Sequence, residues 1–119
     1  MTDRPMQEPT LLLLTALADQ PRHGYAIVQE VLAMSGGRVR LRTGTLYGAL
    51  DRLLKEELIE IHSEETVEGR MRRSYALTAS GRTTLTTEAQ RLRATAAEAE
   101  RRLGLTLRLP RLNQKEATA

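Results

Sequence analysis

Residues 43–54 read TGTLYGALDRLL, and the leucine spacing in this stretch predicts the fold. On a helical wheel the apolar side chains fall on one face: Leu46, Ala49, Leu50, Leu53 and Leu54. We therefore expect a helix that begins at Thr43, its N-cap, ends near Glu57 and buries this face. The opposite side carries small and polar residues: Gly44, Thr45, Gly48, Asp51, Arg52 and Lys55, with Tyr47 on its flank.

Two shorter helices are expected before this stretch. The first spans about residues 10–19, with Thr10 as its N-cap, and a proline two residues later disfavours its continuation. The second spans about residues 24–33 and is ended by the glycine pair at 36–37. Residues 38–42 alternate strictly between arginine and an apolar residue, which is typical of an extended segment.

Two alternating segments follow the leucine-rich helix. Residues 58–63 and 73–77 have apolar side chains at every second position, which predicts paired strands, and the charged residues 64–72 are expected to form a long loop at the tip of the hairpin. The order helix, helix, extended segment, helix, hairpin is that of a helix-turn-helix followed by a wing, in which the third helix reads DNA. The expected fold is mainly α with a small β-hairpin.

A long helix is predicted after the hairpin, from a cap at Thr78 to about Leu103, with Gly104 as its stop signal. Its apolar positions alternate in steps of four and three residues: Leu85, Ala89, Leu92, Ala96, Ala99 and Leu103. Such a seam is typical of a helix that packs on a partner helix. Packing on its own domain explains part of the stripe, but about 25 helical residues extend roughly 37 Å, more than a small three-helix core covers.

These patterns predict three regions. We expect a winged-helix DNA-binding domain over residues 10–78 and a C-terminal dimerisation helix over residues 79–104. Residues 105–119 are expected to form an extended or disordered tail.

The composition excludes several classes of protein. The chain has 119 residues and no cysteine, which excludes disulfide scaffolds, thiolate nucleophiles and cysteine-ligated zinc. Its two histidines are too few and too far apart for a metal site, and no nucleophile–base set is recognisable, so we expect neither an enzyme nor a cofactor. The apolar run at 11–14 is too short to span a membrane, and the N-terminus does not resemble a signal peptide, so we expect a cytoplasmic protein.

The net charge is weak evidence for a nucleic-acid partner. It is +3, from 18 Lys and Arg against 15 Asp and Glu. The charge is −2 over residues 1–37, +1 over residues 38–81 and +4 over residues 82–119. The positions of the individual arginines must therefore decide whether a DNA-binding surface exists.

The chain resembles the PadR family of bacterial transcriptional regulators. The matching segments lie in order: LLLLTAL at 11–17, HGYAI at 23–27, GTLYGAL at 44–50, RL at 52–53, LIE at 58–60 and RRSYALTASG at 72–81. The resemblance implies a winged helix with a C-terminal dimerisation helix, and the single helix after the wing is similar to the short branch of the family. It also implies a DNA contact for Tyr47.

The start of the third helix offers backbone N–H groups and a partial positive charge to a phosphate. Thr43 and Thr45 add hydroxyl donors, and Gly44 and Gly48 allow close approach to a major groove. Helix-start geometry at Gly44 and a tolerated defect at Gly48 are the alternatives.

Several further side chains have both a DNA-contact and a structural interpretation. Tyr47 and Tyr25 are either packing rings or phosphate contacts. Arg52 is a candidate for a bidentate contact to guanine, or else an ion-pair partner of Asp51 or Glu56.

The hairpin carries Arg70, Arg72 and Arg73, which either contact DNA or neutralise nearby glutamates; Arg70 and Arg72 are the preferred contacts. The full predicted DNA-binding set is Tyr25, Arg40, Arg42, Thr43, Gly44, Thr45, Tyr47, Gly48, Arg52, Lys55, Arg70, Arg72 and Arg73.

We therefore expect a homodimeric, sequence-specific transcriptional regulator, a repressor that binds a pseudo-palindromic operator in double-stranded DNA and is released by a small-molecule effector. The alternative is a winged-helix module that binds protein or RNA without reading DNA bases. The chain has no Phe or Trp to stack on an aromatic effector, so a regulator that needs no signal, or one that a protein modulates, is a further alternative.

Overall fold

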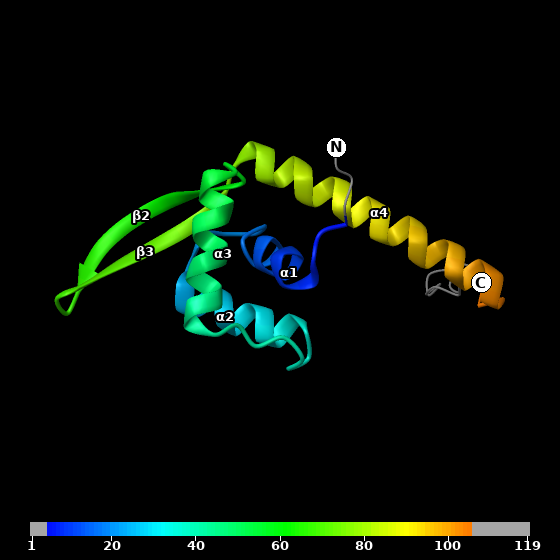
Figure 1. The fold of residues 1–119 in the computed structure, drawn as a ribbon, viewed down its shortest axis with the longest axis horizontal. Helices are drawn as coiled ribbons and strands as arrows, with labels where there is room; N and C mark the ends of the chain where they lie inside the picture. The colour runs from blue at the N-terminus through cyan, green and yellow to red at the C-terminus, as the bar shows by residue number, and fades with distance from the viewer. Residues whose placement is uncertain (1–4, 106–119) are drawn as a thin grey trace, which may run out of the picture. The chain divides into compact units, whose positions relative to one another are not determined.

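The computed structural model describes residues 5–105. Its elements are α1 (Glu8–Ala16), β1 (Arg22–His23), α2 (Gly24–Met34), α3 (Thr43–Lys55), β2 (Ile59–Val67), β3 (Arg70–Leu77) and α4 (Ala79–Leu103) (Figure 1). The strands form an antiparallel sheet in the order β1-β3-β2. The predicted fold class, mainly α with a small hairpin, is confirmed. The predicted tail lies outside the described residues, apart from Leu105.

The leucine-rich N-terminal segment forms α1, but both predicted ends were wrong. The helix begins at Glu8, with Pro9 in its first turn, so Thr10 lies inside it rather than at its cap. It ends at Ala16 because the N–H groups of the next two residues donate to carbonyls three positions back, and Arg22 Nε donates to the Ala16 carbonyl at 2.7 Å. Leu13 and Leu14 are fully buried.

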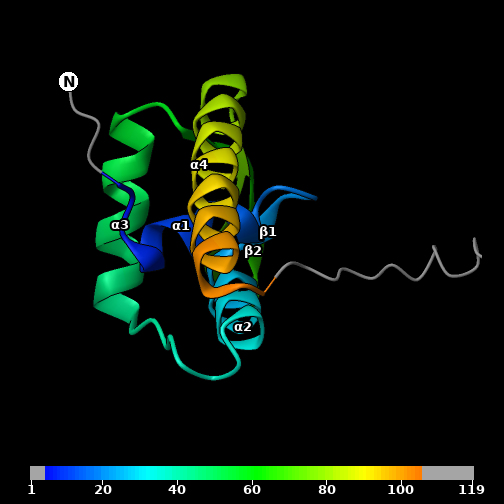
Figure 2. The ribbon, with the colours of Figure 1, turned by 90° about the vertical axis from the view of Figure 1, so that its right-hand side faces the viewer.

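Helix α2 has the predicted glycine stop. Gly36 and Gly37 have φ angles of +64° and +87°, and the Gly37 N–H donates to the Leu32 carbonyl at 2.8 Å. After the turn at residues 35–37, residues 39–42 belong to no helix or strand, and Arg42 has the extended backbone that the alternation predicted (Figure 2). Val39 and Leu41 pack on the core while the arginines between and beside them are exposed.

Helix α3 presents its leucines to the core as predicted. Leu46, Leu50 and Leu53 are buried among side chains of α1, α2 and the sheet. The N-cap is Arg42, whose side chain makes no capping hydrogen bond, and Thr43 is the first helical residue. The helix ends two residues earlier than expected.

The long charged loop predicted at the hairpin tip was wrong. Strand β2 extends to Val67 and β3 begins at Arg70, so only Glu68 and Gly69 form the turn. Their φ angles are +51° and +79°, as a two-residue type I′ connection requires. Glu64 and Glu65, which were expected in the loop, therefore lie within β2, opposite Arg73 and Arg72 of β3. Strand β1, which the sequence did not reveal, pairs with the base of β3.

Helix α4 begins and ends as predicted. Thr78 Oγ1 accepts a hydrogen bond from the Gly81 N–H at 2.9 Å, and Gly104, with φ of +75°, follows the last turn. The chain divides into two compact units after Glu88, so the first ten residues of α4 belong to the first unit. In that unit Leu85 packs against the hydrophobic core.

Candidate nucleic-acid interface

Helix α3 has an exposed face of small and polar residues. Gly44, Gly48, Asp51 and Lys55 recur at steps of four, three and four residues, so they form one exposed stripe. A Cβ added at Gly44 or Gly48 would meet no atom within 4 Å. Packing within the described chain therefore gives no reason for glycine at either position.

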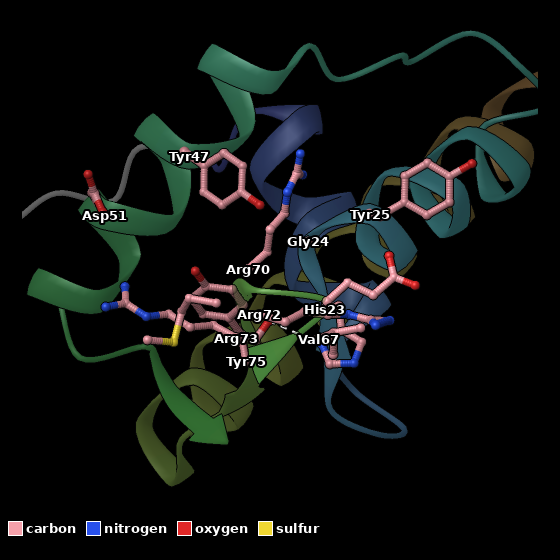
Figure 3. Close-up of a pocket in the computed structure, with 12 residues that line it drawn as sticks. His23, Gly24, Tyr25, Tyr47, Asp51, Val67, Arg70, Arg72, Arg73 and Tyr75 are labelled. Atoms are coloured by element: carbon pink, nitrogen blue, oxygen red, sulfur yellow. Dashed lines mark hydrogen bonds between the residues drawn. The ribbon is translucent and has the colours of Figure 1, made fainter. Parts of the chain in front are cut away.

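A groove of about 540 Å³ lies between α3, the start of α2 and the hairpin. Figure 3 shows Tyr47 and Asp51 projecting from α3, with Arg70, Arg72 and Arg73 coming from β3. The groove unites five residues of the predicted DNA-binding set: Tyr25, Tyr47, Arg70, Arg72 and Arg73. The other predicted residues do not line it: Arg40, Arg42, Thr43, Gly44, Thr45, Gly48, Arg52 and Lys55.

Several groove residues were missing from the prediction: His23, Gly24, Asp51, Val67, Glu68, Met71 and Tyr75. Val67 and Met71 were assigned to a polar loop, so their places on paired strands could not be recognised. Tyr75 was recognised only as an apolar strand residue. His23 and Gly24 could have been found from the sequence, because they directly precede Tyr25, a predicted DNA contact, in the HGYAI segment.

All three tyrosines of the chain line this groove, with different exposures. Tyr25 is 75% exposed, which does not fit a packing ring, and Tyr47 is 46% exposed. Tyr75 is buried, and this burial raises the pKa of its phenol. Two hydroxyl-bearing rings are thus accessible from solvent, and the third forms the floor.

Some arginines are neutralised by neighbouring acids. Arg38 pairs with Glu8 at 2.7 Å, and this pair raises the pKa of Arg38 and lowers that of Glu8. Arg73 Nε lies 3.0 Å from Glu64, and the pKa of Arg73 is raised mainly by the hydroxyl of Tyr75 and then by Glu64.

Arg52 has partners on two sides. Its Nη1 lies 3.7 Å from Glu56, and its Nη2 donates to Thr10 Oγ1 at 3.0 Å. The structure therefore contains the Glu56 ion pair that was the alternative to a guanine contact. The Asp51 pair is not formed.

Five other cations of the predicted site lie apart from these ion pairs. Within residues 5–105 no ion pair or side-chain hydrogen bond holds Arg40, Arg42, Lys55, Arg70 or Arg72. These five lie before α3, at its C-terminal end and at the hairpin, all exposed. An anion that binds to these five cations need not displace an intramolecular carboxylate.

His23 connects β1 to the hairpin. Its Nδ1 lies 3.3 Å from the Arg73 carbonyl oxygen, and its Nε2 lies 3.8 Å from Glu65. His23 thus has a structural contact on each side of its ring. Among residues 5–105 no three His, Asp or Glu side chains are grouped to hold a metal ion, and no described helix has the length and apolar character of a membrane span.

Three helices packed on a common core and a three-stranded sheet, with one face of the third helix exposed beside the hairpin, define a winged helix-turn-helix. Solved structures share this fold. A PadR family transcription regulator from Clostridium difficile is 26% identical, with a TM-score of 0.67 over 82% of this chain and 99% of that one. PadR from Bacillus subtilis, solved in complex with operator DNA, is 23% identical, with a TM-score of 0.61 over 70% of this chain and 47% of that one.

The transcriptional regulator PadR-like family model matches residues 13–87, and the chain belongs to this family. The transcriptional regulator Rv3488 of Mycobacterium tuberculosis is 36% identical over 88 residues, which are 74% of this chain and 78% of that protein. The chain spans 21% and 65% of the lengths of two other curated relatives. The family consists of transcriptional regulators, as the sequence resemblance implied, and not of enzymes.

Proposed function

We propose that the chain forms a homodimer that binds a pseudo-palindromic operator through α3 and the hairpin and represses transcription in the cytoplasm. The observation that carries the proposal is the distribution of free cations on the first unit. The arginines without acidic partners in the described chain include Arg42, beside the start of α3, and Arg70 and Arg72, on the wing. A winged helix binds DNA with these two elements.

Helix α3 is suited to the major groove. Its N-terminus offers backbone N–H groups to a phosphate, with the exposed hydroxyls of Thr43 and Thr45 beside them. Gly44 and Gly48 leave open space on the exposed stripe, so the backbone can approach base edges. Tyr47 is oriented toward the groove between α3 and the wing, where its hydroxyl can donate to a phosphate.

The wing supplies the second set of contacts. Arg70 adjoins the two-residue turn, and Arg72 lies two residues further along the same strand, β3. Arg73 is held by Glu64, which makes it the weakest of the three candidates. We assign Arg70 and Arg72 to phosphates or to the minor groove.

Dimerisation is assigned to α4. In the second unit the seam residues are all exposed: Ala89, Leu92, Ala96, Ala99 and Leu103. Leu92 is 46% and Leu103 is 72% exposed, and apolar side chains at heptad spacing are stabilised by burial against a partner helix. Leu85 is partly buried on its own domain, so the seam proper begins at Ala89.

The start of α4 is fixed to the end of α3, which supports a route for effector control. Thr78 Oγ1 donates to the Glu57 carbonyl at 2.7 Å, and the Thr78 N–H donates to the Leu58 carbonyl at 3.1 Å. An effector that alters the pairing of two α4 helices would therefore change the spacing of the two α3 helices. We propose that repression is relieved in this way, because half-sites about one helical turn apart tolerate little change in spacing.

A gel-shift assay on the DNA upstream of the chain's own gene tests DNA recognition. We expect a salt-sensitive, site-specific shift that a scrambled duplex does not compete away. The double variant Arg42→Ala, Arg70→Ala should lose the shift while it remains dimeric, and Arg38→Ala is the matched control because Arg38 is already paired with Glu8. Absence of any specific shift would contradict the proposal and favour a module for protein or RNA.

Effector control is tested by thermal-shift screening of small molecules, followed by measurement of operator release. We expect a compound that raises the melting temperature to release the operator at similar concentrations. Compounds that stabilise the protein without changing operator affinity would contradict effector control.

A further inference from the structure

An acidic residue occupies the middle of the proposed DNA-reading surface. Asp51 lies on the exposed stripe of α3, one turn after Gly48 and one turn before Lys55, and it lines the groove with Tyr47. Figure 3 shows its carboxylate projecting from α3. The cations around it would attract phosphates, which a carboxylate at this position repels.

No intramolecular partner explains this carboxylate. Within the part of the chain that the structure describes, Asp51 has neither an ion pair nor a side-chain hydrogen bond. The adjacent Arg52 is turned toward Glu56 and Thr10 instead. If α3 enters a major groove, Asp51 loses water, and a desolvated carboxylate without a donor is costly.

A base can supply the missing donor. In the major groove cytosine presents its N4 amino group, whereas guanine presents two acceptors and thymine an acceptor and a methyl group. Adenine has an amino group, but its N7 acceptor lies beside it and repels a carboxylate. Cytosine is thus the base that best satisfies an aspartate.

We propose that Asp51 is a specificity-determining residue that accepts a hydrogen bond from the N4 amino group of a cytosine in each half-site. The bare backbone at Gly44 and Gly48 allows the helix to approach closely enough for this short side chain to reach a base. The inference deepens the proposed function and rests on it.

In vitro selection from a random duplex library tests the assignment. The wild-type chain should enrich a palindrome with a C·G pair at one position of each half-site. Asp51→Asn should shift that position toward A·T, because an amide side chain pairs with adenine, and its preference for the original C·G pair should fall about tenfold. Asp51→Ala should lose the preference without gaining another. Asp19→Asn, the same change on an exposed loop, should select the wild-type sequence.

Different outcomes would contradict the role of Asp51 and the proposed recognition of an operator. If Asp51→Asn binds every duplex more tightly, scrambled DNA included, and selects an unchanged sequence, Asp51 only repels phosphate and the inference is wrong. If the wild-type chain enriches no sequence, operator recognition itself fails. Circular dichroism of each variant verifies that the fold is retained.

Discussion

The hydroxyl oxygen of Tyr47 lies too close to Gly24 to leave room for a side chain there. A Cβ built on Gly24 would be 2.7 Å from that oxygen and 3.3 Å from a methyl group of Leu46. Gly24 is the first residue of α2 and Tyr47 is on the second turn of α3. The missing side chain therefore lets the ring of Tyr47 rest against the start of α2, at the edge of the groove proposed to meet DNA.

Gly24→Ala should destabilise the domain and displace Tyr47. We expect a loss of about 1 kcal/mol in the free energy of unfolding, at the low end for overpacking because the clashing atom ends a flexible side chain. Denaturant titration measures this loss. In a Tyr47→Phe background, where the oxygen is absent, the same change should cost less, and an equal cost in both backgrounds would show that the contact is unimportant.

Gly81→Ala should be far more damaging. A Cβ at Gly81 would overlap the carbonyl oxygen of Leu58, a backbone atom that also accepts the Thr78 N–H. We expect a loss of about 3 kcal/mol, because only a shift of α4 or of the segment before β2 relieves the overlap. Thermal and denaturant unfolding should agree on this loss, and a variant as stable as wild type would disprove the close packing.

Gly48→Ala should separate stability from DNA binding. Alanine at this open helical position should stabilise the protein by up to about 1 kcal/mol. Operator affinity should nevertheless fall, since the new methyl group faces the DNA. Unfolding curves and fluorescence anisotropy measure the two effects. A stabilised variant with wild-type affinity would mean that Gly48 is only a tolerated defect.

Leu92→Glu should convert the dimer to a monomer. A charge at the centre of the seam would be buried without a partner on association. Ala94→Glu is the matched control, because position 94 lies on the opposite side of α4 from the seam. Light scattering after size-exclusion chromatography gives the masses. A dimeric Leu92→Glu variant would exclude this seam as the interface.

The local signals in the sequence were sufficient for α2, for α4 and for the buried face of α3. Leucine spacing identified the buried face of α3, and Thr78 and Gly104 marked the ends of α4 because caps depend on neighbouring residues alone. The hairpin turn was missed because glutamate, as at Glu68, rarely adopts a positive φ. The pairing of β2 with β3, which closes the turn between Val67 and Arg70, holds it there.

The site was harder to predict than the fold. The sequence gives the positions of the arginines, but it does not show which of them are paired with an acidic side chain. Arg38 and Arg40 are similar in sequence, yet only Arg38 meets an acid, Glu8, thirty residues away. Strand β1 and the Gly24–Tyr47 contact likewise depend on tertiary packing, which no local pattern encodes.

The salt dependence of operator affinity tests the central claim most directly. Log affinity should fall linearly with log salt concentration for the wild-type chain. Arg70→Ala and Arg72→Ala should each reduce the slope by about 0.9 for every phosphate that is no longer neutralised, and thus by about 1.8 in a dimer that carries the change twice. Arg38→Ala should leave the slope unchanged. Equal slopes for all four proteins would contradict the assignment of the free arginines to DNA.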